Sequence, residues 1–350
     1  MCCAMRTRII DQARWAVLDK ILRWRTGKTE AASMPTTAEA KQVTAAHWSE
    51  NMAGSDAFSP QVYWLAVPAV QERHRRRACA DTGYGGWVKY CLAQFLRADA
   101  PVEHMLSIGC GSGALERELF QLNAFEHCDA IDIAPAALDV AKREAAASGA
   151  GNIHYQLMDV EAVDLPQGRY DAIWFNGSLH HIRELEAVCA RVRAALKPGG
   201  WLFFNEYVGA SCFDFEPAQR EAIRHAFALI PPRFRYSFVA GSAGTIQDNV
   251  PLPDPLEVRR VDPSEAVRSS EIMKVVGDFF DIETSNPCGG TLLQFVLHGI
   301  AGNFRQDDPE SMRVLRMLFD IEDGLIESGS LASDFVVVAA RAGTSAGVPS

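Results

Sequence analysis

The sequence predicts an α/β fold of the doubly wound type, in which helices cover both faces of a mainly parallel sheet. The first observation is the segment Met105–Ala114, where a short apolar run is followed by glycines at positions 109, 111 and 113. The second is the alternation of short apolar runs with stretches of helical composition through residues 102–207. This alternation is typical of parallel sheets, which bind their ligands at the carboxyl ends of the strands.

The glycine turn follows the first strand and precedes a helix, because Ala114–Leu122 has helix-forming composition. Glycine lets the backbone turn sharply and lets a ligand approach main-chain N–H groups that a Cβ would shield. The order of strand, turn and helix therefore predicts a site for a nucleotide-like cofactor. It leaves two classes of enzyme open, since Gly109, Gly111 and Ala114 also satisfy the pattern of nicotinamide dehydrogenases.

The next two predicted strands supply carboxylates. His127–Ile133 contains Asp132 near its end, and Asn152–Leu157 is followed closely by Asp159. A carboxylate at the first of these strand ends can accept hydrogen bonds from both hydroxyls of a ribose, and one at the second can bind an exocyclic amine. Because both classes of cofactor contain a ribose, Asp132 does not separate them.

The fourth and fifth predicted strands separate the two classes. Tyr170–Phe175 is followed by the segment Asn176–His181, and the turn Leu196–Gly200 leads into a strand that ends in Asn205-Glu206-Tyr207. With these motifs, residues Val102–Tyr207 resemble the class I S-adenosylmethionine-dependent methyltransferases. The alternative, a nicotinamide dehydrogenase, requires no particular residue at the end of the fourth strand and no Leu-Lys-Pro-Gly-Gly turn before the fifth.

The resemblance implies a site for S-adenosyl-L-methionine and assigns roles to particular residues. The loop with Gly109, Gly111 and Gly113 would pass under the methionine and ribose. Asp132 would contact the ribose hydroxyls, and Ile133 would pack on the adenine face. Asp159 would contact the adenine amino group, Val160 would give a neighbouring main-chain contact, and Asn176 would face the methionyl group. One position departs from the family pattern. Ser107 stands where the family often has Asp or Glu, so we expect recognition of the cofactor's amino group to depend on another residue.

The remaining core elements lie in the last third of the chain. A helix is predicted from Pro263 through Val276, a sixth strand at Phe279–Glu283 and a seventh at Asp334–Ala340. The resemblance implies a Rossmann-like sheet of seven strands, whose last strand is antiparallel and lies between the fifth and sixth.

Composition shifts and long connections divide the chain. Ala, Ser, Thr and Pro dominate residues 29–41, which is typical of a linker, and residues 208–261 are too long for a simple connection after a strand. The predicted organisation is a basic amphipathic segment with linker (1–40), an N-terminal helical cap (41–98), the cofactor-binding core (99–208), an inserted acceptor lid (209–263), the rest of the core (264–341) and a flexible tail (342–350).

Three polar residues at adjacent strand ends are candidates for catalysis. His180, His181 and Glu206 would face the reactive methyl group, where an alcohol acceptor needs a base as attack proceeds. His181 is the first choice, because many relatives have a histidine at that position. Glu206 could be the base itself, orient a histidine or hold an acceptor hydroxyl. The alternative for a histidine beside a sheet is a packing or hydrogen-bonding role.

The predicted activity is methyl transfer to an oxygen of a small-molecule or saccharide-like acceptor. The segments 205–209, 264–268 and 289–293 resemble a bacterial subgroup with poorly defined acceptors, often thought to be glycans or specialised metabolites. Two alternatives stay open. A C- or N-methyltransferase could hold an anionic acceptor through the basic string Arg73–Arg77, in which Arg77 is the candidate carboxylate ligand. A non-catalytic S-adenosylmethionine-binding protein would bind the cofactor without turnover.

Composition excludes several other classes of function. The net charge of −10 argues against a nucleic-acid partner, since affinity for a phosphate backbone requires clustered basic residues. No run of roughly eighteen apolar residues is present, so no spanning helix is expected. Nine cysteines are scattered, including Cys110, Cys128 and Cys189 inside predicted elements or turns, and none has C-x-x-C spacing. This pattern predicts a cytoplasmic protein without a metal site.

Residues 1–30 differ in charge from the rest of the chain. They contain seven Lys or Arg against three Asp or Glu, with tryptophan and aliphatic residues between them. Such a basic amphipathic segment usually packs on its own protein, and the alternative is a helix on an anionic membrane surface. The sequence predicts no oligomeric state.

Overall fold

The computed structural model describes residues 41, 43–44, 60–97 and 100–343. The basic segment and linker predicted for 1–40, and most of the tail predicted for 342–350, lie outside these residues. Within them, one seven-stranded sheet consists of β1 (Val102–Ile108), β2 (Phe125–Asp132), β3 (Ile153–Leu157), β4 (Tyr170–Asn176), β5 (Leu196–Tyr207), β6 (Asp281–Gly289) and β7 (Phe335–Arg341).

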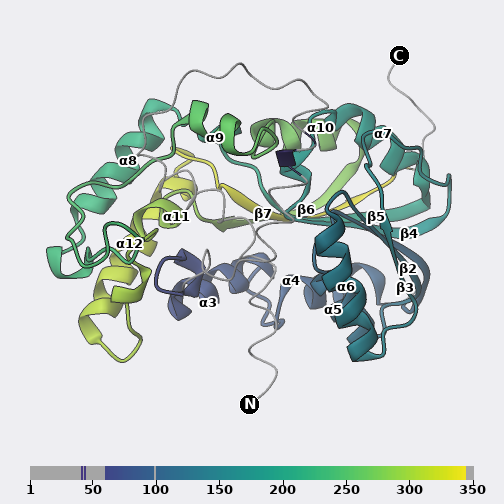
Figure 1. Ribbon diagram of the computed structural model, residues 1–350, viewed down its shortest axis with the longest axis horizontal. Coiled ribbons are helices and arrows are strands. Elements are labelled where there is room, and N and C mark those ends of the chain that lie inside the picture. The colour runs from purple at the N-terminus through teal and green to yellow at the C-terminus, as the bar shows by residue number, and fades with distance from the viewer. Residues whose placement is uncertain (1–40, 42, 45–59, 98–99, 344–350) are drawn as a thin grey trace.

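The strand order confirms the predicted fold class. The sheet runs β3-β2-β1-β4-β5-β7-β6, and β7 is antiparallel to both β5 and β6, whereas the other neighbours are parallel (Figure 1). Ile108 at the end of β1 pairs with Ile131 of β2 and with Phe175 of β4. The carboxyl ends of these three strands are therefore level, and the loops that follow them meet at one edge of the sheet.

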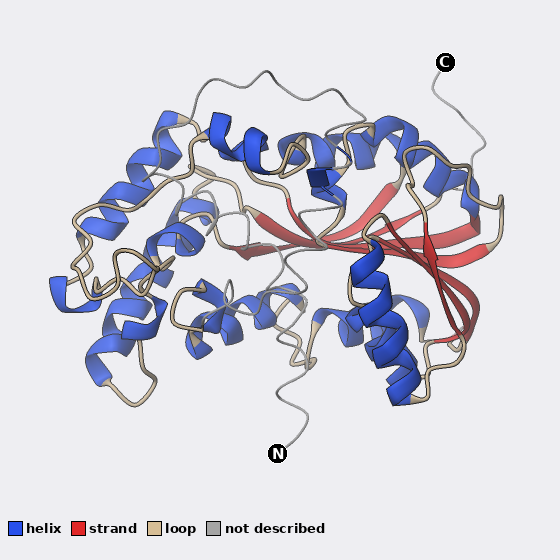
Figure 2. Cartoon of the chain, in the orientation of Figure 1, coloured by secondary structure: helices blue, strands red, loops and turns tan. Residues whose placement is uncertain are grey.

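Helices cover both faces of the sheet (Figure 2). One face packs against α4, α5 and α6, and the other packs against α7 and α10. The helices are α3 (Pro68–Ala78), α4 (Trp87–Cys91), α5 (Ala114–Gln121), α6 (Pro135–Ser148), α7 (Leu185–Ala195), α8 (Pro217–Ala228), α9 (Pro255–Val261), α10 (Ile272–Phe279), α11 (Leu293–Val296) and α12 (Pro309–Glu327). In the described part of the chain, no helix has both the length and the apolar character needed to cross a membrane.

Local sequence signals explain where these elements begin and end. The β4 residues Ala172 to Phe175 are all buried, as expected for a central strand covered on both faces. Helix α6 begins at Pro135, whose missing N–H costs nothing in the first turn, and ends before Gly149 with a φ of 72°. Helix α12 begins after Asp308, whose side chain accepts hydrogen bonds from the backbone of Glu310 and Ser311.

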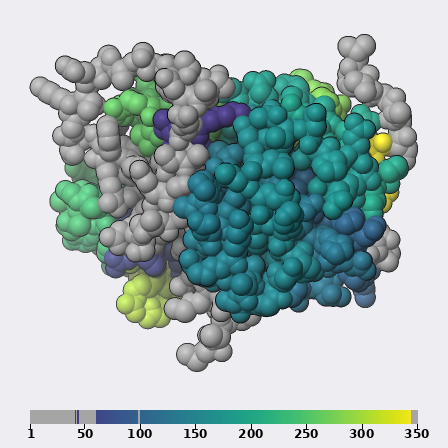
Figure 3. Space-filling view, turned by 45° about the vertical axis from the view of Figure 1, so that its right-hand side comes forward, coloured from purple at the N-terminus to yellow at the C-terminus, as the bar shows by residue number. Residues whose placement is uncertain are grey.

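A helical region lies beyond the β6–β7 side of the sheet. Helix α8 packs on α11, and α11 also packs on α12 (Figure 1). In the space-filling view, the teal residues of the core form a continuous body beside the green and yellow residues of this region (Figure 3). The long connection after β5 is therefore part of a larger helical region that also includes residues from the segment 290–334.

The helix predicted from Pro263 to Val276 is shorter than expected, because α10 begins only at Ile272. Residues before it form turns, and Ala266 has a positive φ of 50°. Two tertiary hydrogen bonds hold this turn: the N–H of Val267 donates to the carbonyl of His180, and the carbonyl of Ala266 accepts from Cys212. The sixth strand is longer than predicted and extends to Gly289, because β7 pairs with it along its length.

Candidate active site

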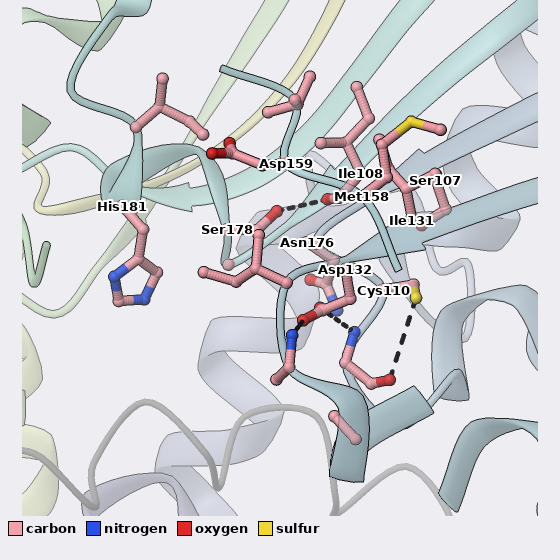
Figure 4. Close-up of a pocket in the computed structure, with 18 of the residues that line it drawn as sticks. Ser107, Ile108, Cys110, Ile131, Asp132, Met158, Asp159, Asn176, Ser178 and His181 are labelled. Atoms are coloured by element: carbon pink, nitrogen blue, oxygen red, sulfur yellow. Dashed lines mark hydrogen bonds between the residues drawn. The ribbon is translucent and has the colours of Figure 1, made fainter. Parts of the chain in front are cut away.

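A cavity of about 200 Å³ lies at the carboxyl ends of the parallel strands. Its walls come from the glycine loop after β1, the end of β2, the segment after β3 and the turn after β4 (Figure 4). Two residues that precede the sheet in sequence, Lys41 and Thr44, and Ser264 complete the lining. The strand ends that the sequence singled out therefore surround one cavity.

The three glycines of the loop have left-handed backbone conformations, with φ of 69°, 52° and 74° at Gly109, Gly111 and Gly113. A Cβ on Gly109 would lie 2.3 Å from the Cβ of Ser178, and one on Gly113 would lie 2.4 Å from the hydroxyl of Tyr155. A Cβ on Gly111 would meet no atom within 4 Å, although this residue lines the cavity. The first and third glycines thus allow close packing, whereas the second leaves room for a ligand.

Asp132 at the end of β2 fixes the loop and faces the cavity (Figure 4). Its two carboxylate oxygens accept hydrogen bonds of 2.8 Å from the backbone of Gly111 and of Ala134. Burial raises the pKa of this carboxyl, while the backbone donors oppose the shift. Each oxygen keeps a second lone-pair direction, so the carboxylate can bind ligand hydroxyls while it holds the loop.

Asp159 lies beyond β3 and is engaged in an ion pair. Its Oδ2 lies 2.6 Å from Nζ of Lys41, which also lies 2.9 Å from Glu161, and its Oδ1 accepts from the backbone of Glu161. Burial opposes the charge on Lys41, but the two carboxylates outweigh it and raise the pKa of the ammonium. A cation from the segment before the sheet thus contacts the carboxylate predicted to take an adenine amine.

The other predicted cofactor residues also reach the cavity. Ile133 and Val160 supply apolar wall, and Asn176 lies at the end of β4, where its side-chain oxygen accepts from Asn205. Sequence reasoning missed several polar lining residues, among them Lys41, Glu116, Ser178 and Ser264. The glutamate was overlooked because an acidic residue in the first turn of a helix is usually a solvated partner of the helix dipole.

His181 points towards the cavity from the turn after β4 (Figure 4). Its Nδ1 lies 2.9 Å from the hydroxyl of Ser264, and that hydroxyl lies 2.7 Å from the carboxylate of Asp262. Since a carboxylate only accepts, the serine proton goes to Asp262 and the serine oxygen then accepts from Nδ1–H. This chain holds the imidazole ring through Nδ1, and Nε2 is buried 4.0 Å from an oxygen of Glu265.

His180 and Glu206 lie behind this surface rather than on it. Both are buried and neither lines the cavity. One oxygen of Glu206 accepts from the backbone N–H groups of Ser178 and Leu179, and the other lies 2.7 Å from Nδ1 of His180. The three candidate catalytic residues are thus neighbours, but in the described chain only His181 reaches the cavity wall.

One cluster in the described residues has ligand types that suit a metal. The nitrogens of His180 and His181 and a carboxylate oxygen of Glu265 lie within 4.8 Å of one another. The Nε2 atoms of the two histidines are 3.9 Å and 4.0 Å from Glu265 oxygens. Ligands of one ion at bond lengths near 2.1 Å lie roughly 3 Å apart, so this spacing is wide for a metal centre.

The arginine string on α3 pairs with protein carboxylates. Arg77 lies 2.5 Å from Asp323 on α12, and Arg73 contacts both Asp323 and the buried Glu322. Neither arginine lines the cavity. The prediction that Arg77 binds a carboxylate of the cofactor or acceptor is therefore wrong, because α12, distant in sequence, supplies its carboxylate partner. The predicted acceptor lid, residues 209–263, likewise contributes no described residue to the cavity wall.

Comparison with known proteins gives a family for the centre of the chain. Residues 105–200 match the family model described as "Methyltransferase domain". The chain is 34% identical over 104 residues to the ubiquinone biosynthesis O-methyltransferase of Albidiferax ferrireducens, a match covering 29% of this chain and 40% of that protein. It is 31% identical over 133 residues to the malonyl-[acyl-carrier protein] O-methyltransferase of Serratia marcescens, covering 37% of this chain and 49% of that protein.

The matched region thus spans less than half the length of these two curated relatives. Among solved structures, the geranyl diphosphate C-methyltransferase of Streptomyces coelicolor A3(2) is 15% identical, with a TM-score of 0.44 over 89% of this chain and 100% of that chain.

S-adenosyl-L-methionine is the cofactor that this domain and its cavity fit. The open space above Gly111 admits a ligand against the loop, the Asp132 carboxylate can bind ribose hydroxyls, and Ile133 and Val160 offer apolar contacts to a base. The sheet order, with the antiparallel β7 between β5 and β6, is the one expected from the sequence resemblance. Residues 105–200 of this chain therefore match a methyltransferase domain in sequence, and they lie in a sheet whose strand order is the one expected from the class I resemblance.

Proposed function

We propose that the protein is an S-adenosylmethionine-dependent methyltransferase that acts on an oxygen of a small-molecule or saccharide-like acceptor. The observation that carries the proposal is the single cavity in which the glycine loop, Asp132 and His181 meet. The two curated relatives named above are O-methyltransferases, which supports an oxygen acceptor. The methyltransferase family model matches residues 105–200, which include the glycine loop and the ends of β2 and β4.

When bound, S-adenosylmethionine supplies an electrophilic methyl group on a positively charged sulfur. Gly109, Gly111 and Gly113 shape the loop that receives it, Asp132 binds the ribose hydroxyls, and Asp159 binds the adenine amine. Ile133 packs on the base, Val160 gives the neighbouring main-chain contact, and Asn176 faces the methionyl group. Alignment of donor and acceptor in a water-poor cavity supplies much of the rate enhancement, because it replaces a bimolecular encounter by a fixed geometry.

His181 accepts the proton of the acceptor hydroxyl. The chain from Asp262 through Ser264 to Nδ1 holds the imidazole ring at the cavity wall. Glu206 and His180 act as positioning residues, since Glu206 holds the backbone of the turn from which His181 projects. The pairing of Arg77 with Asp323 gives no support to an anionic acceptor held by the arginine string. The buried thiols of Cys110, Cys128 and Cys189 support a reducing cytoplasmic location.

The test is to incubate the purified full chain with methyl-labelled S-adenosylmethionine and fractionated cell extract, and then to identify the labelled product by mass spectrometry. The expected result is a product with the label on oxygen, accompanied by S-adenosylhomocysteine. A label on carbon or nitrogen would overturn the oxygen assignment. Tight cofactor binding without turnover in any fraction would show a non-catalytic binding protein instead.

A further inference from the structure

Glu116 is a buried carboxylate in the wall of the cofactor cavity. It lies in the first turn of α5, three residues after Gly113, and its side chain is fully buried. It lines the cavity together with Ser107, Cys110 and Ser112. The roles proposed above for the cofactor site do not use it.

Among the described residues, none forms an ion pair or an ordinary hydrogen bond with the Glu116 carboxylate. Burial raises the pKa of Glu116 to about 7, although the nearby Ser107 hydroxyl and Arg117 oppose the shift. Arg117 donates instead to the carbonyl of Ser112. A buried carboxylate without a counter-charge is costly, so its position in a ligand cavity needs a reason.

The position of Glu116 distinguishes it from the other acidic residues of the cavity. Asp132 holds the end of the glycine loop at β2, and Asp159 and Glu161 lie beyond β3 in ion pairs with Lys41. Glu116 instead lies on the α5 side of the glycine loop, next to the Ser107 position at the end of β1. These placements leave Glu116 as the carboxylate that can meet a cationic group lying against the start of α5.

We infer that Glu116 binds the primary ammonium group of the cofactor's amino-acid portion, in place of the acidic residue that Ser107 replaces. This inference rests on the proposed cofactor. The ligand class is a nucleoside thioether or sulfonium that carries an α-ammonium group. Ser107 and Glu116 line the same part of the cavity, and Glu116 approaches the end of β1 from α5 closely enough for the Ser107 hydroxyl to act on its carboxyl.

Binding of the ammonium favours the charged carboxylate and so releases a proton. The charged or titratable groups facing Glu116 are Cys110 and Asp132 at the cavity, Arg117 on α5, and Cys128 and Tyr155 on β2 and β3. Burial raises the pKa values of both thiols and of the tyrosine, so these groups stay neutral near pH 7. Because this pKa lies near 7, part of the Glu116 carboxyls carry a proton at neutral pH before the ligand binds.

The first experiment uses the wild-type full chain. Calorimetry compares S-adenosylhomocysteine with its deamino analogue, which lacks only the amino group. We expect the deamino analogue to bind roughly tenfold to a hundredfold more weakly, the loss of one charge-assisted pair. Titrations near pH 7 in two buffers of different ionisation enthalpy should show net proton release for S-adenosylhomocysteine and none for the analogue. If the wild type binds both compounds with equal affinity and equal proton release, the inference is overturned, and no variant is needed to show it.

The second experiment uses Glu116→Gln, with Glu118→Gln on the same helix as the matched control. We expect E116Q to bind S-adenosylhomocysteine as weakly as the wild type binds the deamino analogue, and to discriminate little between the two. E118Q should behave like the wild type, since Glu118 does not line the cavity. If E116Q keeps the full preference for the amino group, the inference is wrong while the proposed cofactor stands. If the wild type binds neither compound, the proposed function itself has failed.

Discussion

The carboxylate of Glu206, at the end of β5, lies 2.7 Å from Nδ1 of His180, and both side chains are buried. The same carboxylate accepts hydrogen bonds from the backbone of Ser178 and Leu179. One acidic side chain thus satisfies three donors of the turn after β4. Because His181 belongs to this turn, the hydrogen bonds of Glu206 both stabilise this edge of the sheet and fix the position of His181 at the cavity.

Glu206→Ala should lower the free energy of unfolding by about 3–5 kcal/mol, because it leaves buried donors without an acceptor. Urea unfolding of the ligand-free protein measures this change. Glu221→Ala, on the exposed face of α8, serves as the control and should change stability little. Unaltered stability of E206A would contradict the positioning role.

His181→Ala should lower kcat by about 10²–10⁴-fold with saturating acceptor, since it removes the proposed base. The dissociation constant of S-adenosylhomocysteine should stay within about twofold of the wild type. Initial rates on the identified acceptor and calorimetry give the two values. His225→Ala, an exposed histidine on α8, is the control. A variant that retains more than half of the wild-type kcat would show that positioning alone suffices.

The loop glycines should respond differently to the same substitution. Gly111→Ala should fold with a loss of about 1–2 kcal/mol for the left-handed backbone, but it should bind S-adenosylhomocysteine much more weakly, since the methyl group enters the open space. Gly109→Ala should destabilise the fold more strongly, because its Cβ meets Ser178. Thermal unfolding and calorimetry on both variants separate these effects. Equal binding by G111A and the wild type would argue against a ligand over this residue.

Glu116→Gln should stabilise the ligand-free protein at alkaline pH. The folded pKa of about 7 lies above the ordinary value of 4.5 for a glutamic acid, so the carboxyl favours folding when protonated and this advantage is lost as pH rises from about 4.5 to 7. Above that range the ionised side chain costs at most about 3 kcal/mol. Urea unfolding at about pH 5 and pH 8 should show a larger gain for E116Q at the higher value. Asp334, whose pKa is also about 7, is common to both proteins and cancels in the comparison. A pH-independent difference would refute the assigned shift.

Arg77→Ala should leave the dissociation constant of S-adenosylhomocysteine unchanged, because Asp323 is its partner and the cavity lies elsewhere. The variant should lose stability by about 1 kcal/mol or less, as is typical of a partly exposed ion pair. Calorimetry and urea unfolding give both quantities. A tenfold weaker affinity would restore the earlier expectation that this guanidinium binds the cofactor.

Much of the fold could be predicted from local patterns. The apolar runs that end in Asp132, Asn176 and Glu206 became β2, β4 and β5, and the glycine turn after β1 lies at the cavity as expected. Parallel strands bring their carboxyl ends to one edge, so residues that follow those strands must gather there. The helix predicted from Pro263 does not form in its first turns, because long-range contacts outweigh helical composition there. The backbone of Ala266 and Val267 makes hydrogen bonds with Cys212 and His180 instead.

The order of strand, glycine turn and helix, repeated along the chain, determined the sheet and the edge at which a cofactor fits, because backbone sterics and burial act over short distances. Only the tertiary structure decided which polar side chains share that cavity. It placed His181 on the wall and His180 behind it, gave Arg77 to Asp323, and brought Glu116 into the wall from the helix. The physical reason is that hydrogen bonds and charge pairs form between residues far apart in sequence, whose distances and burial only the packed chain sets.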